Sequence, residues 1–368
     1  MSLPETFKDQ RCARLIDISA LKHNLQCFQT LLGFTKIMAV VKANAYGHGA
    51  SIVAPLLQDS GIDCFAVATI DEAIQLRQCG ITSRIIILGY VHPSSIDTII
   101  HYGLTITLMD IDHAKRIAML SKRIDCVIAI DTGMHRIGIP WCDQTMIDTI
   151  LHDPYLHIVH VYSHLCDSER LDAQAIAMTR LQQHRFDKVI AYIHAFDPSI
   201  TTSLQASYGA LNYPDMHYDY ARIGVGLYGI QYIDTTANLD LKPVLSLYTH
   251  ITHLQVVKPH ESIGYCQLDR SDQQRLIATL SIGYVDGLTK ACRGHSLYID
   301  DHPVAIVGNI CMDQCMIDVT GLDVTIDQPV EIIGNHQTIL DLTKDIPLHF
   351  LEVLTNIDSR VPILAINV

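Results

Sequence analysis

From about residue 37 to residue 230, short apolar runs alternate with longer amphipathic segments. The runs are 37–41, 64–67, 85–88, 104–108, 126–130, 158–162, 200–204 and 223–227, and the segments between them include 51–58, 71–79, 114–120, 145–151 and 173–194. Apolar runs of this length are typical of strands buried on both faces, and the segments have helical spacing. Strand–helix alternation requires crossover connections and a parallel sheet. Eight candidate strands favour a closed (β/α)₈ TIM-type barrel over an open sheet.

One helix start in this region is marked by its own side chains. Thr69 is followed three residues later by Glu72, which is the spacing of a capping box. The helix is therefore expected to begin directly after Thr69.

The pattern changes near residue 243. Segments 245–257, 275–284, 296–310 and 330–333 are rich in β-branched and aromatic residues, and turn formers such as 300–303 separate them. This predicts a mostly antiparallel β domain. We expect a barrel over residues 1–243 and a β domain over residues 244–368, as a chain of 368 residues exceeds the usual size of one core. Residues 1–18 are open to a second interpretation, packing with the C-terminal domain, and residues 20–32 are expected to close the barrel floor as a helix.

Composition excludes several classes of partner. The net charge of −13 argues against nucleic acid and anionic membranes, which require basic patches. No run approaches the ~18 apolar residues of a membrane span, and the N-terminus has no apolar signal core. The eleven cysteines are scattered without framework spacing, which is typical of reduced thiols in a cytoplasm. The twenty histidines lack metal-ligand spacing, so no metal site is expected.

Polar residues gather directly after the predicted strands, where barrel enzymes carry their sites. They are Lys42 and Tyr46 after the first strand, 131–136 after the fifth, Ser163 and His164 after the sixth, Ser207 after the seventh, and Arg222 and Gly224 at the start of the eighth. A lysine in partly apolar surroundings has a lowered pKa and offers a nucleophilic amine. The alternative for Lys42 alone is a strand-end lysine that reaches water or pairs with a carboxylate.

Several motifs then match one family. The stretch Val41-Lys42-Ala43-Asn44-Ala45-Tyr46-Gly47-His48-Gly49 resembles the cofactor-lysine signature of bacterial alanine racemases. Further matches are Asp131-Thr132-Gly133-Met134-x-Arg136-x-Gly138, Arg222-x-Gly224, Ile282-Gly283-Tyr284-x-Asp286-Gly287 and 307–316. The resemblance covers essentially the whole chain. It implies a fold-type III barrel with a β domain, pyridoxal 5′-phosphate as cofactor, and a homodimer that shares its active sites between subunits.

The resemblance implies a two-base interconversion of L-alanine and D-alanine, which provides D-alanine for peptidoglycan. Lys42 would hold the cofactor and act as the base on one face of the α-carbon. Tyr265, reaching the site from the partner subunit, would act on the other face. His164 and Arg222 match residues that link this tyrosine to the pyridine nitrogen side of the cofactor. Without the resemblance, the favoured interpretation of Tyr265 is a packed aromatic of the β domain, that of His164 is a strand-end histidine with satisfied hydrogen bonds, and that of Arg222 is a surface ion-pair partner.

The remaining implied contacts concern phosphate and carboxylate. Tyr46, Ser207, Gly224 and Val225 would bind the cofactor phosphate. Arg136 and the N–H of Met312 would bind the substrate carboxylate, with the cofactor ring oxygen as the alternative for Arg136. Tyr284 would be a wall of the substrate entrance, and Asp313 would support its own loop or Arg136.

Three single positions, and the surroundings of Tyr265 at 263–266, depart from the family pattern. Ala129 stands where many relatives carry a carbamylated lysine that supports Arg136, Ser359 where some place a tyrosine beside the phosphate, and Ala206 where an asparagine is common. A chloride or another carboxylate is our hypothesis for what balances Arg136. The loss of a ring at Ser359 could admit serine, because a hydroxyl or methylene is worth only ~1–3 kcal/mol.

Other functions remain as alternatives. The nearest is a serine or broad-specificity racemase. A decarboxylase or an aldolase on the same barrel would not require Tyr265 on a second face. A non-catalytic carrier of pyridoxal phosphate is the remote alternative, and the β domain argues against it.

Overall fold

The computed structural model describes residues 3–233 and 235–368, and the chain divides into two units. One unit, here called the barrel unit, contains Leu21–Ala45 and Ala50–Lys242. The other, the β unit, contains the N-terminal residues as far as Ala20, the short segment Tyr46–Gly49, and Pro243–Val368.

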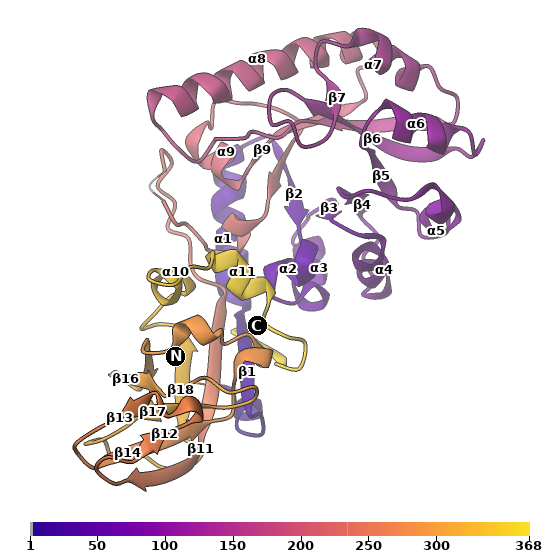
Figure 1. The fold of residues 1–368 in the computed structure, drawn as a ribbon. Coiled ribbons are helices and arrows are strands. Elements are labelled where there is room, and N and C mark those ends of the chain that lie inside the picture. The colour runs from indigo at the N-terminus through magenta and orange to yellow at the C-terminus, as the bar shows by residue number, and fades with distance from the viewer. Residues whose placement is uncertain (1–2, 234) are drawn as a thin grey trace. The chain divides into compact units, whose positions relative to one another are not determined.

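The barrel unit is built on a closed ring of parallel strands, which confirms the predicted (β/α)₈ barrel (Figure 1). β10 pairs with both β2 and β9, and β5 pairs with both β4 and β6, so no edge of the ring is left open. The strands are β2 (Lys36–Val40), β3 (Cys64–Val67), β4 (Arg84–Ile87), β5 (Thr105–Leu108), β6 (Ile124–Asp131), β8 (Leu156–Tyr162), β9 (Thr201–Ala206) and β10 (Tyr220–Ile223). The two-residue β7 (Ile139–Pro140) pairs with the end of β6.

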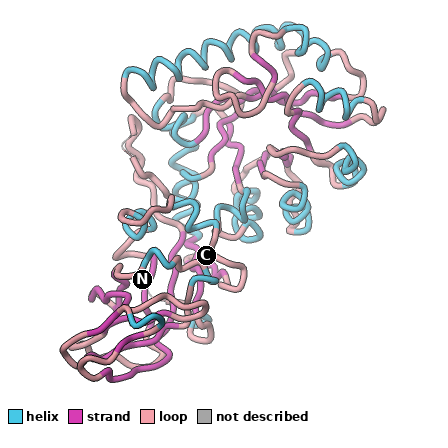
Figure 2. The backbone as a smooth tube through the Cα atoms, in the orientation of Figure 1, coloured by secondary structure: helices cyan, strands magenta, loops and turns pink. Residues whose placement is uncertain are grey.

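Helices lie outside this ring of strands (Figures 1 and 2). α4 begins directly after Thr69, and both hydrogen bonds of the predicted capping box are present. The helices of the unit are α1 (Ile18–Leu32, from residue 21 onward), α3 (Ala50–Asp59), α4 (Ile70–Gln78), α5 (Ile96–His101), α6 (Ile111–Ala118), α7 (Gln144–Leu151), α8 (Ala173–Phe196) and α9 (Ser207–Asn212). The five-residue α2 (Lys42–Tyr46) is of a different kind and is considered with the site.

The eighth strand differs from its prediction. It runs over Tyr220–Ile223 instead of 223–227 and ends before Gly224, whose backbone (φ −117°, ψ −93°) leaves the extended region. The apolar residues that follow form a short 3₁₀ helix, η3 (Val225–Tyr228). Most residues of this 3₁₀ helix are buried, as those of a core strand would be. An apolar run in the sequence therefore could not distinguish the 3₁₀ helix from a strand. Arg222 consequently lies inside the strand and not at its start.

The β unit contains a mostly antiparallel sheet, as predicted. Its order is β14-β17-β16-β15-β18-β11-β1-β19, and β14 also pairs with β11. The strands are β1 (Cys12–Asp17), β11 (Leu245–Val257), β14 (Arg275–Leu280), β15 (Ser296–Ile299), β16 (His302–Val307), β17 (Cys315–Asp318), β18 (Pro329–Ile333) and β19 (Ile363–Ile366). β12 (Ser262–Ile263) and β13 (Asp269–Arg270) form a separate hairpin, and α10 (Ile339–Thr343) and α11 (Phe350–Thr355) precede β19.

The N-terminal segment contributes to this second sheet. β1 pairs antiparallel with β11 over Cys12–Ile16 and parallel with β19 over Arg14–Asp17. All but the last of its residues are buried. Across the described ranges, no helix combines the length and the apolar character that crossing a membrane requires.

Candidate active site

The chain makes a left-handed turn directly after Lys42. Residues 43–46 all have positive φ, between 50° and 55°, although none of them is a glycine. Such residues each cost about 1–2 kcal/mol in this region, so other contacts must hold the turn. Glu72 Oε1 accepts the Ala43 N–H at 2.7 Å, and Asn44 Oδ1 accepts the Ala50 N–H at 2.8 Å. The carboxylate of the α4 capping box therefore also fixes the backbone beside Lys42.

The surroundings of Lys42 favour its neutral amine. Its pKa is lowered, mainly because the side chain is largely removed from water and secondarily because Arg136 is close, while Glu72 acts in the opposite direction. A lysine with a lowered pKa can act as a nucleophile and as a base.

Arg222 is a buried cation that pairs with no carboxylate among the described residues. It is 4% exposed. Its Nη1 donates to Ser203 O at 2.9 Å and to Ser203 Oγ at 2.5 Å, and its Nη2 donates to Ser163 O at 2.6 Å and to Leu204 O at 2.9 Å. Burial lowers the pKa of Arg222 to about 10, so it stays charged at neutral pH. Within the described residues its Nε–H has no hydrogen bond, which leaves this donor for a ligand.

His164 lies beside Arg222 and stays neutral. Its Nδ1 is 3.2 Å from Arg222 Nη2. Burial lowers the pKa of His164 to about 3, and the nearby charges of Arg222, Arg136 and Lys42 act in the same direction. The neutral ring can therefore accept a hydrogen bond from the guanidinium.

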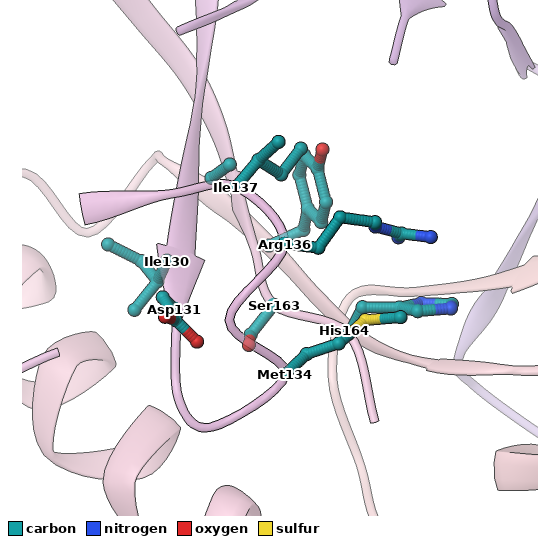
Figure 3. A pocket seen from close by; sticks show the side chains of 9 residues that line it. Ile130, Asp131, Met134, Arg136, Ile137, Ser163 and His164 are labelled. Atoms are coloured by element: carbon teal, nitrogen blue, oxygen red, sulfur yellow. The ribbon is translucent and has the colours of Figure 1, made fainter. Parts of the chain in front are cut away.

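A pocket joins Arg136 to His164. Figure 3 shows both side chains extending to the same side, Arg136 from the loop after β6 and His164 from the end of β8. The pocket is lined by Ala129, Ile130, Asp131, Met134, Arg136, Ile137, Tyr162, Ser163 and His164. Asp131 does not neutralise Arg136, since it accepts from its own loop at Gly133 N and His135 N and pairs with the His135 ring at 2.9 Å. Among the described residues, no carboxylate forms an ion pair with Arg136.

Ser207 and Gly224 meet at the start of α9. Ser207 Oγ accepts the N–H groups of Gly224 at 3.1 Å and Gly226 at 3.2 Å, so its own proton can be donated outward. The Gly224 N–H is thus used within the chain. A Cβ at Gly226 would lie 2.4 Å from the Phe28 ring, so only glycine permits this close approach. Val225, which lies between these two glycines, is the first residue of the 3₁₀ helix η3.

In the β unit, the residues expected to meet substrate lie at the surface. Tyr265 is 69% exposed, Met312 53% and Tyr284 37%. The Tyr284 turn is bonded to the Met312 loop by the N–H of Tyr284 to Cys311 O at 3.0 Å and by the N–H of Val285 to Met312 O at 3.1 Å. These two segments therefore form one element.

A cluster of charged residues holds that element. Asp286 is fully buried and accepts from Arg11, from Arg360 Nε at 3.1 Å and from the Gly283 N–H at 2.8 Å. Arg360 also pairs with Asp313 at 2.8 Å. Asp313 thus supports its loop through Arg360, a residue that sequence reasoning did not single out.

The structure brings together part of the predicted set within each unit. In the barrel unit Lys42, Arg136, His164 and Arg222 are electrostatically coupled, and Ser207 bonds Gly224. Tyr46, whose pKa burial raises to about 12, is grouped with the β unit, as are Tyr265, Tyr284, Met312 and Asp313. Glu72 was recognised from sequence as a helix cap but not as the support of the Lys42 turn. Asp286 is part of the family motif at 282–287, and that motif was the only indication of its importance in the sequence.

These residues fit a phosphate-bearing aldehyde such as pyridoxal phosphate. Lys42 offers an amine with a lowered pKa, and Ser207 offers an O–H beside a glycine-lined turn. Arg222 offers an Nε–H that has no hydrogen bond in the described part of the chain, and its cation lacks a carboxylate partner there. Positive charge with free donors suits an anionic ligand.

Comparisons with known proteins agree with this fold. The sequence profile of the alanine racemase N-terminal domain matches residues 16–232, and that of the C-terminal domain matches residues 244–365. The chain is 34% identical to alanine racemase 2 of Oceanobacillus iheyensis, over 87% of this chain and 83% of that protein. It is 39% identical to the serine/alanine racemase of Enterococcus gallinarum over 97% of this chain. It spans about half the length of that relative, 52%, and 51% of the amino-acid racemase of Enterococcus faecalis.

Solved structures show the same relationship. An alanine racemase of Clostridium difficile 630 superposes with a TM-score of 0.91 at 28% identity, covering 97% of both chains. The alanine racemase of Bartonella henselae with covalently bound pyridoxal phosphate superposes with a TM-score of 0.84 at 27% identity, covering 97% of this chain and 100% of that one. On these matches and on its fold, the chain belongs to the alanine racemase family.

Proposed function

We propose that this protein interconverts L-alanine and D-alanine with pyridoxal 5′-phosphate as cofactor. The observation that carries the proposal is the barrel-end cluster of Lys42, Arg136, His164 and Arg222. It combines an amine of lowered pKa with two arginines that no carboxylate neutralises among the described residues. A cofactor with a phosphate and a substrate with a carboxylate supply the negative charge that this cluster lacks.

Lys42 is the base on one face of the substrate α-carbon in this proposal. When bound, pyridoxal phosphate supplies the electron sink that makes the α-proton removable. Lys42 holds the cofactor and then, once released, takes or returns the proton. Its lowered pKa keeps a neutral amine accessible for this role.

The second base is Tyr265 of the partner subunit. Its 69% exposure in one chain leaves the phenol accessible to another subunit, which supports a homodimer with shared sites. An unperturbed tyrosine has a pKa of about 10, so it requires a nearby cation or hydrogen-bond donor to act near neutral pH. Arg222 supplies the cation, and His164 connects to it at 3.2 Å.

Arg222 also has a role toward the cofactor ring. Its Nε–H would donate to the pyridine nitrogen while the guanidinium keeps its own proton, since its pKa is about 10. By keeping its proton, Arg222 would leave the bound cofactor a weaker electron sink, which would limit side reactions. Ser207, Tyr46 and the backbone at Val225 would bind the phosphate. Arg136, with the N–H of Met312, would bind the substrate carboxylate.

The test is incubation of the purified protein and pyridoxal phosphate with L-alanine, followed by chiral chromatography. The expected result is D-alanine rising until both enantiomers are equal, since they have the same free energy in water. A protein that binds the cofactor but forms no D-alanine would contradict the proposal.

A second candidate is a racemase that also accepts serine. The relative named serine/alanine racemase is 39% identical over 97% of this chain. Ser359, which is exposed, stands where the resemblance places a tyrosine in some alanine racemases. Rates with alanine and serine should be measured side by side for the natural protein and for Ser359→Tyr. If Ser359 admits serine, Ser359→Tyr reduces the serine rate several-fold more than the alanine rate. Equal reductions would assign serine use to another position.

A further inference from the structure

Strand β8 carries a buried histidine that is not part of the candidate site. His160 is four residues before His164 and is 1% exposed. Its ring meets the Tyr220 ring edge-on, with centroids 5.9 Å apart. It does not line the pocket that joins Arg136 to His164. A buried imidazole needs partners for both nitrogens, and those partners identify what it does.

The hydrogen bonds of His160 have a defined direction. Thr201 Oγ1 donates to Val159 O at 3.0 Å, so toward His160 Nδ1, 2.8 Å away, it can only accept. Nδ1 therefore carries the proton and Nε2 is an acceptor. Ser203 Oγ, 2.8 Å from Nε2, is then the donor to the ring. Because the Ser203 hydroxyl proton is donated to His160 Nε2, Ser203 Oγ can accept the hydrogen bond from Arg222 Nη1 at 2.5 Å.

The charges around His160 agree with this neutral form. Burial lowers the pKa of His160 to about 3, and Arg222 and Arg84 act in the same direction. A protonated ring would make both nitrogens donors, and Ser203 Oγ would then face donors on both sides.

We propose that His160 is a positioning residue for Arg222, acting through Ser203. By accepting the Ser203 proton at Nε2, it keeps the hydroxyl oxygen available to the guanidinium. This fixes the orientation in which Nη2 reaches His164 and in which Nε has no hydrogen bond among the described residues, so that it would be available to the cofactor. A buried cation without a carboxylate depends on such neutral acceptors, because an unpaired charge away from water is costly. The part of this inference that concerns the cofactor rests on the proposed function.

His160→Phe tests the inference by keeping a ring and removing the acceptor. The Ser203 proton then loses its partner and can rotate toward the guanidinium. We expect kcat to fall about tenfold with KM for alanine within about twofold, and the visible absorbance maximum of the bound cofactor to shift. His160→Gln, which retains an acceptor for Ser203, should recover most of kcat. His157→Phe is the matched control, because His157 lies on the same strand but at the surface, paired with Asp125 at 2.7 Å.

A double-mutant cycle with Ser203→Ala separates this role from general packing. If His160 acts through Ser203, His160→Phe should change kcat little further once Ser203 is alanine. Additive losses would overturn the inference. So would a His160→Phe protein that melts earlier but retains the natural kcat and spectrum while folded. If His160→Phe does not fold, His160→Met, which also removes the nitrogen acceptor, replaces it in the cycle with Ser203→Ala.

The tautomer can be tested without the cofactor. The ¹⁵N shifts of the His160 imidazole, assigned by comparison with His160→Gln, should show a neutral ring protonated at Nδ1 near pH 7. A ring protonated at Nε2, or at both nitrogens, would overturn the inference. This measurement does not depend on alanine racemisation, so it distinguishes failure of the positioning role from failure of the proposed function.

Discussion

Two buried charges, Asp286 in the β unit and Arg222 in the barrel unit, are accommodated in opposite ways. In the β unit, Asp286 is fully buried and is matched by Arg11 and Arg360. In the barrel unit, Arg222 is 4% exposed and its partners are carbonyl oxygens, a hydroxyl and a neutral histidine. One group of charges is neutralised within the chain, and the other is left with net positive charge.

This difference separates stability from function. A buried ion pair whose partners are both present fixes a local structure, and removing one partner is strongly destabilising. A cluster of cations held by neutral acceptors is suited to bind an anion instead. Substitutions in the Asp286 cluster should therefore act first on the stability of the loops that carry Tyr284 and Met312. Substitutions in the barrel cluster should act first on cofactor and catalysis.

Lys42→Ala should have the largest effect. Without the amine there is neither a covalent attachment point nor a base, so we expect a loss of activity of ~10³-fold or more. The visible absorbance of the lysine-bound cofactor should disappear. Lys36→Ala is the control, because Lys36 lies at the start of the strand that precedes Lys42 and pairs with Asp63 at the surface. A Lys42→Ala protein with an unchanged spectrum would contradict the assigned role.

Tyr265→Phe should have the next largest effect on activity, and the effect should differ between the two enantiomers. Loss of one of two bases is expected to reduce α-proton removal from one enantiomer by ~10²-fold and from the other by much less. Incorporation of solvent deuterium into each enantiomer measures this asymmetry. Tyr298→Phe, on β15, is the matched control. Equal small losses for both enantiomers would exclude the two-base scheme.

Mixing the two inactive proteins tests whether sites are shared. A dimer of one Lys42→Ala chain and one Tyr265→Phe chain has one site with both natural residues if each site takes its lysine and tyrosine from different chains. Part of the activity should then return. Heterodimers that form but stay inactive would indicate self-contained sites.

The sequence predicts the barrel end better than the contacts that hold it. Parallel strands joined by helices place their ends together, so Lys42 and His164 could be assigned to one end of the barrel from periodicity. Arg222 could not, because its strand was predicted over 223–227 instead of Tyr220–Ile223 and its role came from the resemblance. The left-handed turn at 43–46 could not, because alanine and tyrosine have no preference for positive φ. Its support, Glu72, had a sufficient local explanation as a helix cap.

The long-range polar pairs could not be predicted from the sequence for a related reason. Arg360 and Asp286 lie far apart in sequence, and neither has a neighbour that signals the pair. His160 interrupts an apolar strand, and its partners Thr201 and Ser203 lie on the next strand of the ring. Strand periodicity identifies which face a residue occupies but not which polar atoms meet there.

Arg360→Met should have a moderate and local effect. Asp286 keeps Arg11, so we expect a loss of about 1 kcal/mol instead of the larger cost of an unpaired buried charge. Hydrogen exchange at the Tyr284 and Val285 amides, which bond the Met312 loop, should become faster. KM for alanine should rise about threefold if that loop binds the carboxylate. Arg293→Met, in an exposed position, is the control, and unchanged exchange would show that Arg360 does not hold the loop.

The smallest effects should be two opposite shifts in the titration of Lys42. Arg136 lowers the pKa of Lys42 and Glu72 raises it, against a larger lowering by burial. In cofactor-free protein, Arg136→Met should therefore move half-maximal labelling of Lys42 by an amine-reactive reagent to higher pH. Glu72→Gln should move it to lower pH, because the amine then loses a stabilising negative charge. Peptide mass spectrometry across a pH series measures both, with Asp63→Asn, beside Lys36, as the control. Shifts in the same direction would mean that altered burial of Lys42, and not the charges of Arg136 and Glu72, determines the change in its pKa. The contrast with the Asp286 cluster would then rest less on charge at this end of the barrel.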